Sequence, residues 1–230
     1  MFRQLLAVFR SDNPMHGVGV DFVRMIRLTE DMTRSAGHLF LGDQAAVLDR
    51  AHLYEFDVQV NKLERDIRKR VVAHLSIPGN NSDAAFSLLL MSLIKDVERI
   101  GDYAKNVAEI ADLMTVPVPS DDVGQELRSL REQVEAFFGG AAESFATSDR
   151  ERALALIEKS RGIAIRCDAL IPRVVQADYN AATTAALVLA ARYYKRINGH
   201  LLNVLSSVVM PVHKVDYYDE DEIPKDTRQP

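Results

Sequence analysis

The 230-residue sequence has few of the residues that form covalent cross-links or thiolate metal sites. Its single cysteine, Cys167, excludes an intramolecular disulfide, and no cluster of cysteine and histidine has the spacing of a zinc site. These absences favour an ordinary reducing cytoplasm as the compartment. We expect Cys167 to be a buried helix residue.

Long hydrophobic stretches are also missing. The longest uninterrupted apolar run, residues 185–191, is far shorter than the roughly 20 residues that a membrane-spanning helix needs. The first ten residues are amphipathic but lack the apolar centre of a signal peptide. We expect a soluble chain whose first residues pack against its body, with a peripheral membrane anchor as the alternative.

Neither a strong positive charge nor a catalytic motif is present. The net charge of -5 argues against a general nucleic-acid binder. A local basic run alternates with Glu64 and Asp66 and is interpreted as a solvated helix face. The run consists of Lys62, Arg65, Arg68, Lys69 and Arg70. There is no Gly-rich phosphate loop, Ser-His-Asp arrangement or nucleophilic cysteine setting, so the sequence favours a protein that is not an enzyme.

What the sequence does contain is apolar residues at helical spacing. Hydrophobic residues make up 47% of the chain, enough for a sizeable core. The first predicted helix begins at Pro14 and ends at Gly42. The second begins after Gly42, exceeds roughly thirty residues and ends at Pro78, and the third runs from about Ser82 to just before Pro117. Three further helices are predicted over residues 122–146, 149–176 and 178–209.

The two halves of the chain repeat each other. A shift of 97 residues without a gap superposes the third predicted helix on the sixth, placing Arg99 on Arg196 and Asn106 on Asn203, together with the apolar seam. A segment rich in proline and acid, residues 115–122, separates the halves. The sequence therefore predicts an all-α fold of two tandem antiparallel three-helix bundles, over residues 1–116 and 121–210, followed by an acidic tail over 211–230.

One face of the third predicted helix carries an acidic stripe. Glu98, Asp102 and Asn106 are spaced four residues apart, and Glu109 follows three residues later, so their oxygen atoms lie beside the apolar seam. Hard cations prefer such oxygen ligands. Spacing alone favours an ordinary solvated face, because cations lie three residues from one carboxylate or another. These cations are Lys95, Arg99 and Lys105.

A second acidic stripe changes that balance. On the second predicted helix, Asp57, Asn61 and Glu64 recur at intervals of four and three, again beside the apolar seam. Antiparallel packing would bring this stripe against the first. Two facing acidic stripes are typical of a metal site.

The string Val-Glu-Arg-Ile-Gly-Asp-Tyr-Ala-Lys-Asn-Val-Ala-Glu, residues 97–109, closely resembles the signature of the PhoU family of phosphate-uptake regulators. The resemblance extends over roughly residues 14–210 and implies two three-helix bundles. In that family each copy carries a Glu-x-x-x-Asp motif that can hold iron, zinc, manganese or magnesium. The resemblance implies that Glu98 and Asp102 bind a divalent or iron-type ion, with Asn106 and Asp57 completing the candidate ligands.

The second copy departs from this pattern. Lys195 stands where glutamate would stand and Gly199 where aspartate would stand, and only Asn203 is kept. A lysine ammonium there would repel a cation, so we expect no second metal site. His200 has no acidic neighbour on its own helix and is interpreted as a surface or interface residue rather than a ligand.

The resemblance implies a non-catalytic, metal-binding adaptor that regulates phosphate transport and phosphate-dependent signalling. Its expected partners are a phosphate transporter, through the ATPase subunit or the permease, and a sensor histidine kinase. A homodimer in the cytoplasm is expected, reaching the inner face of the membrane through its transporter partner. Two alternatives stay open: a di-iron carboxylate enzyme or metal store, although no histidine follows a glutamate at the spacing such sites use, and a metal-free helical scaffold.

Overall fold

The computed structural model describes residues 15–42, 50–211 and 214–215. Within these residues the chain forms six α-helices, two short 3-10 helices and no strand, which confirms the predicted all-α fold. The α-helices are α2 (His16–Leu41), α3 (Arg50–Leu75), α4 (Ala84–Ile110), α5 (Asp122–Thr147), α6 (Arg150–Gln176) and α7 (Ala181–Val209). The 3-10 helices are η1 (Asn80–Asp83) and η2 (Ala111–Leu113). The amphipathic first residues, the start of the second predicted helix and the acidic tail beyond residue 215 lie outside the described residues.

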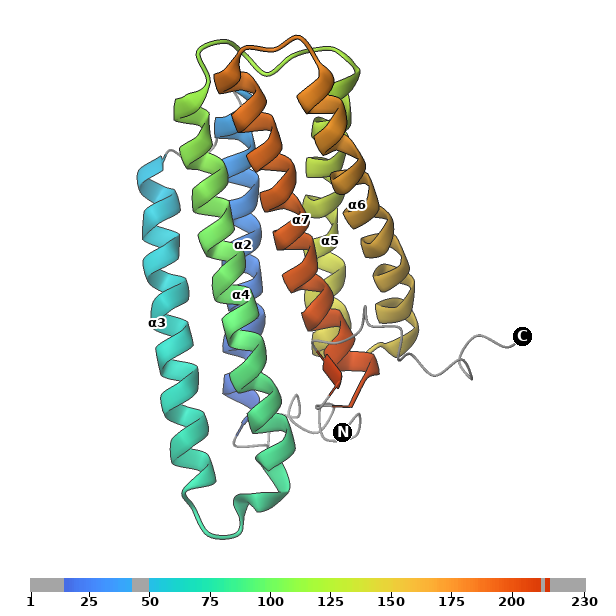
Figure 1. Ribbon diagram of the computed structural model, residues 1–230. Coiled ribbons are helices and arrows are strands. Elements are labelled where there is room, and N and C mark those ends of the chain that lie inside the picture. The colour runs from blue at the N-terminus through green and yellow to red at the C-terminus, as the bar shows by residue number, and fades with distance from the viewer. Residues whose placement is uncertain (1–14, 43–49, 212–213, 216–230) are drawn as a thin grey trace, which may run out of the picture.

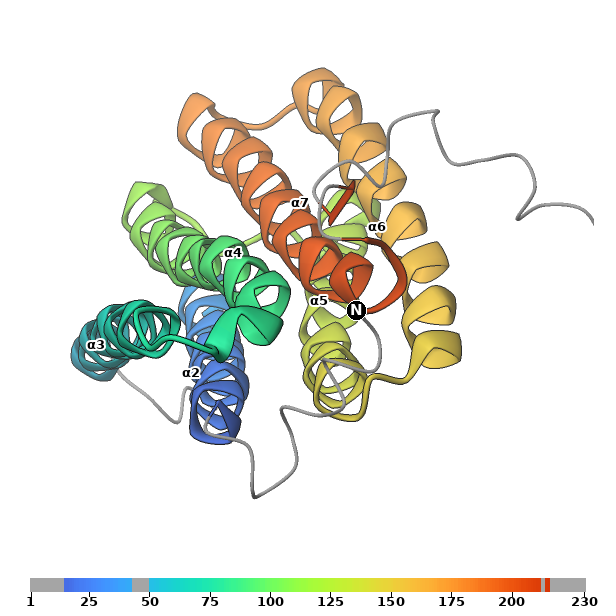
Figure 2. The same ribbon diagram turned by 90° about the horizontal axis from the view of Figure 1, so that it is seen from below.

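The helices form two groups of three that lie side by side (Figure 1). Helices α2, α3 and α4 make one group, and α5, α6 and α7 make the other (Figure 2). The groups meet where α4 packs against α7 and α2 packs against α5. Phe22 of α2 contacts Phe145 of α5 at a ring-centroid distance of 4.7 Å, and both side chains are fully buried. The hydrophobic core is therefore continuous from one group to the other, and the division into domains at residues 116–121 stays a prediction.

Side-chain caps determine where the helices of the second group begin. Asp121 accepts hydrogen bonds from the amides of Val123 and Gly124 at the start of α5. Asp149 accepts one from the Arg152 amide in α6, and Asn180 accepts one from the Thr183 amide in α7. Such caps satisfy amides that have no partner within the helix. The observed α5 and α6 accordingly start within one residue of the predicted positions, whereas α7 starts three residues late because Asn180 is its cap.

The connection between the groups differs from the prediction. The third predicted helix continued to just before Pro117, but α4 ends at Ile110, one turn of 3-10 helix follows, and Met114 is extended. Pro117 and Pro119 disfavour helix at Val116 and Val118, directly before them, so the chain stays non-helical up to Ser120. The connection then lies so close to α5 that a Cβ on Gly124 would stand 1.8 Å from the Pro119 carbonyl oxygen. This position therefore requires glycine.

The crossing of α4 and α7 has the internal symmetry expected of a duplication. The 97-residue shift relates Asp96 to Tyr193 and Tyr103 to His200. Across the crossing, Asp96 bonds His200 at 2.7 Å and Tyr103 packs on Tyr193 at a centroid distance of 5.9 Å. Exchanging the two copies converts the first contact into the second. The repeat seen in the sequence is thus also a repeat in the way that the copies contact each other.

Candidate functional site

The two predicted acidic stripes do face each other, across the interface between α3 and α4. Glu98 and Asp102 are one turn apart on α4, and Asp57 lies opposite on α3. The carboxylates of Asp57 and Asp102 meet at a third side chain, Lys105 of α4. Its ammonium nitrogen lies 2.9 Å from Oδ1 of Asp57 and 3.0 Å from Oδ1 of Asp102.

Lys105 is the most enclosed cation of this interface. Its side chain is 19% exposed, and that of Asp57 is 16% exposed. Partial burial alone would lower the pKa of Lys105, but the hydrogen bonds to Asp57 and Asp102 outweigh it and raise the pKa above its usual value. The ammonium therefore stays charged throughout the physiological pH range and bridges the two helices.

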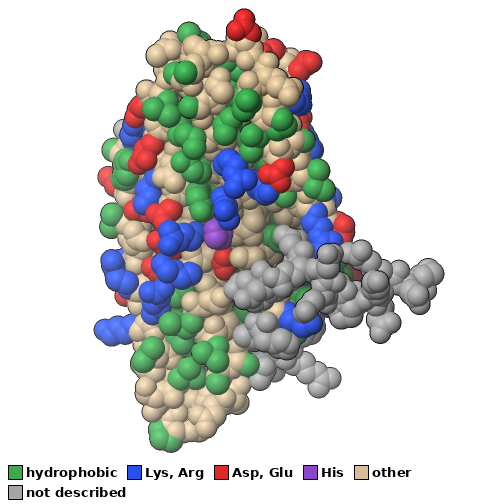
Figure 3. All heavy atoms as spheres, viewed as in Figure 1, with side chains coloured by type: hydrophobic (Ala, Val, Ile, Leu, Met, Phe, Trp, Pro, Cys, Tyr) green, Lys and Arg blue, Asp and Glu red, His purple; other side chains and the backbone are tan. Residues whose placement is uncertain are grey.

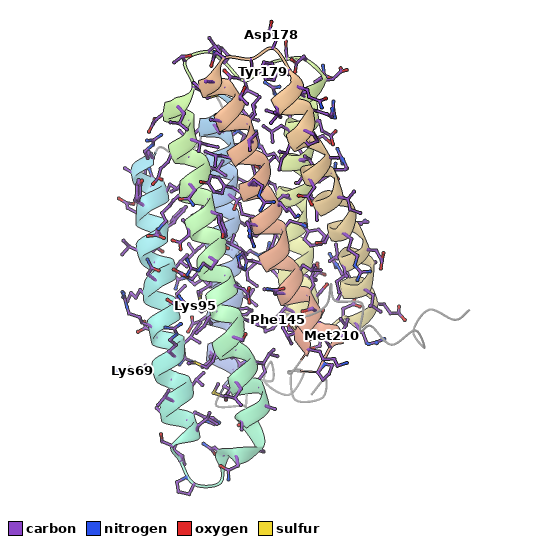
Figure 4. The ribbon with its side chains drawn as sticks, in the orientation of Figure 1. Lys69, Lys95, Phe145, Asp178, Tyr179 and Met210 are labelled. Carbon is purple, nitrogen blue, oxygen red and sulfur yellow. The ribbon has the colours of Figure 1, made fainter. Side chains whose placement is uncertain are left out.

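A second lysine, Lys95, bridges the interface ten residues before Lys105 on α4. Lys95 lies 3.3 Å from Glu98 and 3.6 Å from Glu64 of α3, where α4 faces α3 (Figure 4). Arg68 pairs with Glu64 at 2.8 Å, as an ion pair rather than a well-aligned hydrogen bond. Arg99 approaches Asp102 at 3.4 Å and Glu98 at 4.0 Å. Cations and carboxylates thus alternate along the interface, and Figure 3 shows charged side chains of both signs across the middle of this face.

The structure therefore brings the predicted ligands together only in part. Asp57 and Asp102 share a cation, Glu98 belongs to the neighbouring ion pairs, and Asn106 stands one turn beyond Asp102 outside this series of contacts. In the described part of the chain no three His, Cys, Asp or Glu side chains are grouped as metal ligands. As arranged, the donor set does not fit a metal ion, because an ammonium holds the point shared by the two aspartates. The metal assignment stays a prediction.

The equivalent interface in the second copy, between α6 and α7, has a lysine where the first copy has Glu98. Lys195 of α7 donates a hydrogen bond to Asp168 of α6, and Arg192 lies 3.6 Å from the same carboxylate. A Cβ on Gly199 would meet no atom within 4 Å, so the missing side chain leaves open space. The expectation that no metal binds here likewise stays a prediction. The structure adds that Lys195 pairs with Asp168.

The sequence interpretation missed one acidic group at the crossing of the copies. Asp96 of α4 is buried and accepts hydrogen bonds from Nδ1 of His200 and, at 2.8 Å, from Nδ2 of Asn203. His200 also stacks on Tyr103. It is an interface residue, as expected, but its acidic neighbour comes from the other copy. The 97-residue shift could have drawn attention to Asp96, because it relates this acidic residue to an aromatic one, Tyr193.

One further side chain, Cys167, bears on the chemistry of the chain. Cys167 is buried in α6, and burial raises the pKa of its thiol to about 12. A thiol with such a pKa is a poor nucleophile.

None of the described helices combines the length and low charge needed to cross a membrane.

Comparison with known proteins provides independent support for the sequence resemblance. A family model of the PhoU domain matches residues 22–111, which run from α2 to the end of α4 and hold the intact acidic motif. Proteins named "Phosphate-specific transport system accessory protein PhoU homolog" from Pseudomonas putida and Pseudomonas aeruginosa are each 28% identical over 172 residues, 70% of this chain. The match covers 65% of the first relative, just under two thirds of its length, and 69% of the second.

Solved structures show that the fold is shared as well. A crystal structure of PhoU from Pseudomonas aeruginosa superposes with a TM-score of 0.76 at 22% identity, over 85% of this chain and 95% of that one. A crystal structure of the phosphate transport system regulatory protein PhoU from Streptococcus pneumoniae superposes with a TM-score of 0.73 at 16% identity, over 88% and 94%. The signature, the PhoU domain over residues 22–111 and the shared fold together support a divergent member of the PhoU family.

Proposed function

We propose that the protein regulates phosphate transport and phosphate-dependent signalling as a non-catalytic adaptor. The observation that carries the proposal is the PhoU domain in the first copy, since the relatives that share it are named as accessory proteins of a phosphate-specific transport system. The partner is a phosphate transporter, through its ATPase subunit or its permease, or the sensor kinase that controls phosphate genes. The adaptor acts by contact, and the proposal requires neither a reaction nor a metal ion.

An adaptor needs a surface that remains free for its partner, and the outer face of α3 offers one. Helix α3 lies at the edge of the molecule and packs against α2 and α4 (Figure 2). Positions three or four residues apart form one exposed stripe along it. The stripe consists of Tyr54, Val58, Lys62, Arg65, Lys69 and Val72.

The chemistry of this α3 stripe indicates what it binds. Lys62, Arg65 and Lys69 at its centre have no ion-pair partner within the described residues. Their neighbours Arg68 and Arg70, in contrast, pair with Glu64 and Asp21. Val58 and Val72 are exposed on either side of the cations. A basic centre between apolar ends complements an acidic protein surface with an apolar border. The solvated face predicted for this run thus has a specific part that is available for docking.

Phosphate uptake in a deletion strain tests the function. Deleting the gene is expected to raise phosphate uptake and phosphate-gene expression in phosphate-replete medium, and the wild-type gene should restore both. A strain with unchanged uptake and unchanged expression would refute the regulatory role.

Affinity purification from phosphate-replete cells tests the α3 stripe. The variant Lys62→Glu/Arg65→Glu/Lys69→Glu should lose the transporter subunit or kinase that the wild-type protein retains. The control Arg24→Glu/Lys159→Glu/Arg196→Glu reverses three exposed cations on other helices, gives the same net charge and should retain the partner. Equal retention by both variants would exclude the stripe as the docking surface. The expected homodimer and the cytoplasmic location stay predictions alongside it.

A further inference from the structure

We propose that Lys105 takes the place of a bound cation in the acidic interface of the first bundle. The native protein then neutralises its own Glu-x-x-x-Asp motif, and a divalent-cation site is latent, exposed only when the positive charge of residue 105 is removed. This inference is independent of the proposed function, since a regulator can act with or without a metal.

The hydrogen bonds of the two aspartates carry the first step. Oδ1 of Asp57 contacts Lys105, and Oδ2 accepts a hydrogen bond from Asn61 at 3.2 Å. Oδ1 of Asp102 contacts Lys105, and Oδ2 lies 3.4 Å from Arg99. Every carboxylate oxygen of the pair therefore already has a donor from this chain. A metal ion at the point shared by the two aspartates would have to displace the Lys105 ammonium.

The charge balance carries the second step. Four carboxylates of the α3–α4 interface form ion pairs with four cations, and Glu109 accepts a hydrogen bond from Tyr54 instead. The carboxylates are Asp57, Glu64, Glu98 and Asp102, and the cations are Arg68, Lys95, Arg99 and Lys105. A site for a divalent ion normally has excess negative charge that the ion neutralises. This group of ion pairs has no such excess, so the electrostatic gain from a cation added among them is small.

The position of Lys105 makes it different from the other three cations. Lys95 and Arg99 are 51% and 54% exposed and can swing into solvent at little cost. Lys105 is mostly enclosed between the helices, and a metal bound between Asp57 and Asp102 would leave its ammonium beside a second positive charge. Separating an enclosed charge from its partners is costly. Lys105 is therefore the residue that keeps a metal out.

The same geometry explains why a site would form without the lysine charge. One point, the Lys105 nitrogen, lies within 3.0 Å of an oxygen from each aspartate. A hard cation takes oxygen ligands at about 2.0–2.6 Å, so small shifts would let both aspartates bind it. Glu98 lies one turn from Asp102 on the same helix, and Asn61 one turn from Asp57, and water can complete the coordination.

Manganese(II) binding tests the proposal directly, because the electron paramagnetic resonance signal of free aqueous manganese disappears when the ion binds. Four proteins are compared: wild type, Lys105→Met, which keeps the length of the side chain without its charge, Lys105→Arg, which keeps the charge, and Lys62→Met, which removes an exposed lysine elsewhere on the interface helices. Lys105→Met should bind manganese about tenfold or more tightly than wild type, as removal of a nearby unit charge predicts. Lys105→Arg and Lys62→Met should behave as wild type, and Lys105→Met/Asp57→Asn/Asp102→Asn should lose the gained binding.

Two results would overturn the proposal. One is wild-type protein that is purified with a stoichiometric metal, or that binds manganese as tightly as Lys105→Met; this result needs no variant to fold. The other is a Lys105→Met or Lys105→Gln protein with a wild-type circular dichroism spectrum and no gain in binding. Neither result bears on phosphate regulation, which the deletion strain tests separately.

Discussion

The interfaces α3–α4 and α6–α7 occupy equivalent places in the two copies, yet they keep almost none of the same charges. The 97-residue shift places Glu98 on Lys195 and Asp102 on Gly199. A shift of 103 residues overlays the buried positions of α3 on those of α6 and places Asp57 on Ser160 and Glu64 on Cys167. The overlaid buried positions are Val60 on Ile163, Ile67 on Leu170 and Val71 on Val174.

The apolar positions were therefore kept while all four carboxylates of the first interface were replaced in the second. Burial constrains the apolar positions, because removing a buried side chain leaves a cavity. Charges at a partly exposed interface contribute little to stability, so they can change once any function that they serve is lost. The first copy retains the motif and balances it with lysine, whereas the second has lost it and pairs Lys195 with Asp168 instead.

The largest expected effect concerns whether the two copies are separate at all. Phe145→Ala removes a fully buried ring that packs on Phe22 across the copies and should lower the free energy of unfolding by about 3–5 kcal/mol. If the core is one unit, hydrogen exchange followed by mass spectrometry should show lost protection in α3 and α6 alike. Val175→Ala, at an exposed position of α6, is the control. Loss of protection confined to α5, α6 and α7 would show that the copies unfold independently.

A smaller effect is expected at the crossing of the copies. Asp96→Ala leaves the donors of His200 and Asn203 without their buried acceptor and should lower the free energy of unfolding by about 1–3 kcal/mol in urea denaturation. The equivalent position in the second copy, Tyr193, makes only a ring contact in the corresponding place. Tyr193→Phe keeps that ring and should stay within about 0.5 kcal/mol of wild type. Equal losses from the two variants would mean that the Asp96 hydrogen bonds contribute nothing beyond packing.

The fold was largely predictable because its signals are local and repeated. The apolar spacing, the proline breaks and the 97-residue repeat predicted all six helices in order, since each depends on residues near one another in sequence. The end of α4 was predicted too late, because the apolar spacing continues through Ala111 and Met114 although the helix ends at Ile110.

The candidate site was predictable only to the level of residue types. The sequence identified the carboxylates and noted the cations beside them, but spacing on one helix could not decide that Lys105 reaches α3 and bridges Asp57 to Asp102. The partner of His200 was missed for the same reason, since Asp96 belongs to the other copy. Which donors saturate a carboxylate depends on the register of two packed helices, which a single sequence does not show.

Restoring the lost motif should test the comparison from the second copy. Lys195→Glu removes an ion pair and sets a glutamate against Asp168, at an expected cost of about 0.5–1 kcal/mol because both side chains are partly exposed. Adding Gly199→Asp fills open space and completes a Glu-x-x-x-Asp motif, with Leu202 at the position equivalent to Lys105. This double variant should quench the free manganese signal more than wild type. Lys195→Glu/Gly199→Asp/Leu202→Lys should quench it less, and no difference between the two would show that a lysine at this position does not control metal binding.

The smallest effect on stability concerns Cys167, the residue that stands in the second interface where Glu64 stands in the first. This effect is absent at neutral pH, where the thiol is uncharged in the folded and the unfolded chain. Burial is the main reason that the pKa of its thiol rises from 9.0 to about 12. Because the folded-state pKa is raised, the stabilisation associated with the neutral thiol is fully present below pH 9 and is lost as the pH rises toward 12. Iodoacetamide should therefore modify Cys167 slowly in the folded protein at pH 9 and rapidly after unfolding in urea, as measured by intact mass. If the folded thiol reacts as fast as the unfolded one, the α6–α7 interface must open readily. The two interfaces would then differ in their dynamics as well as in their charges.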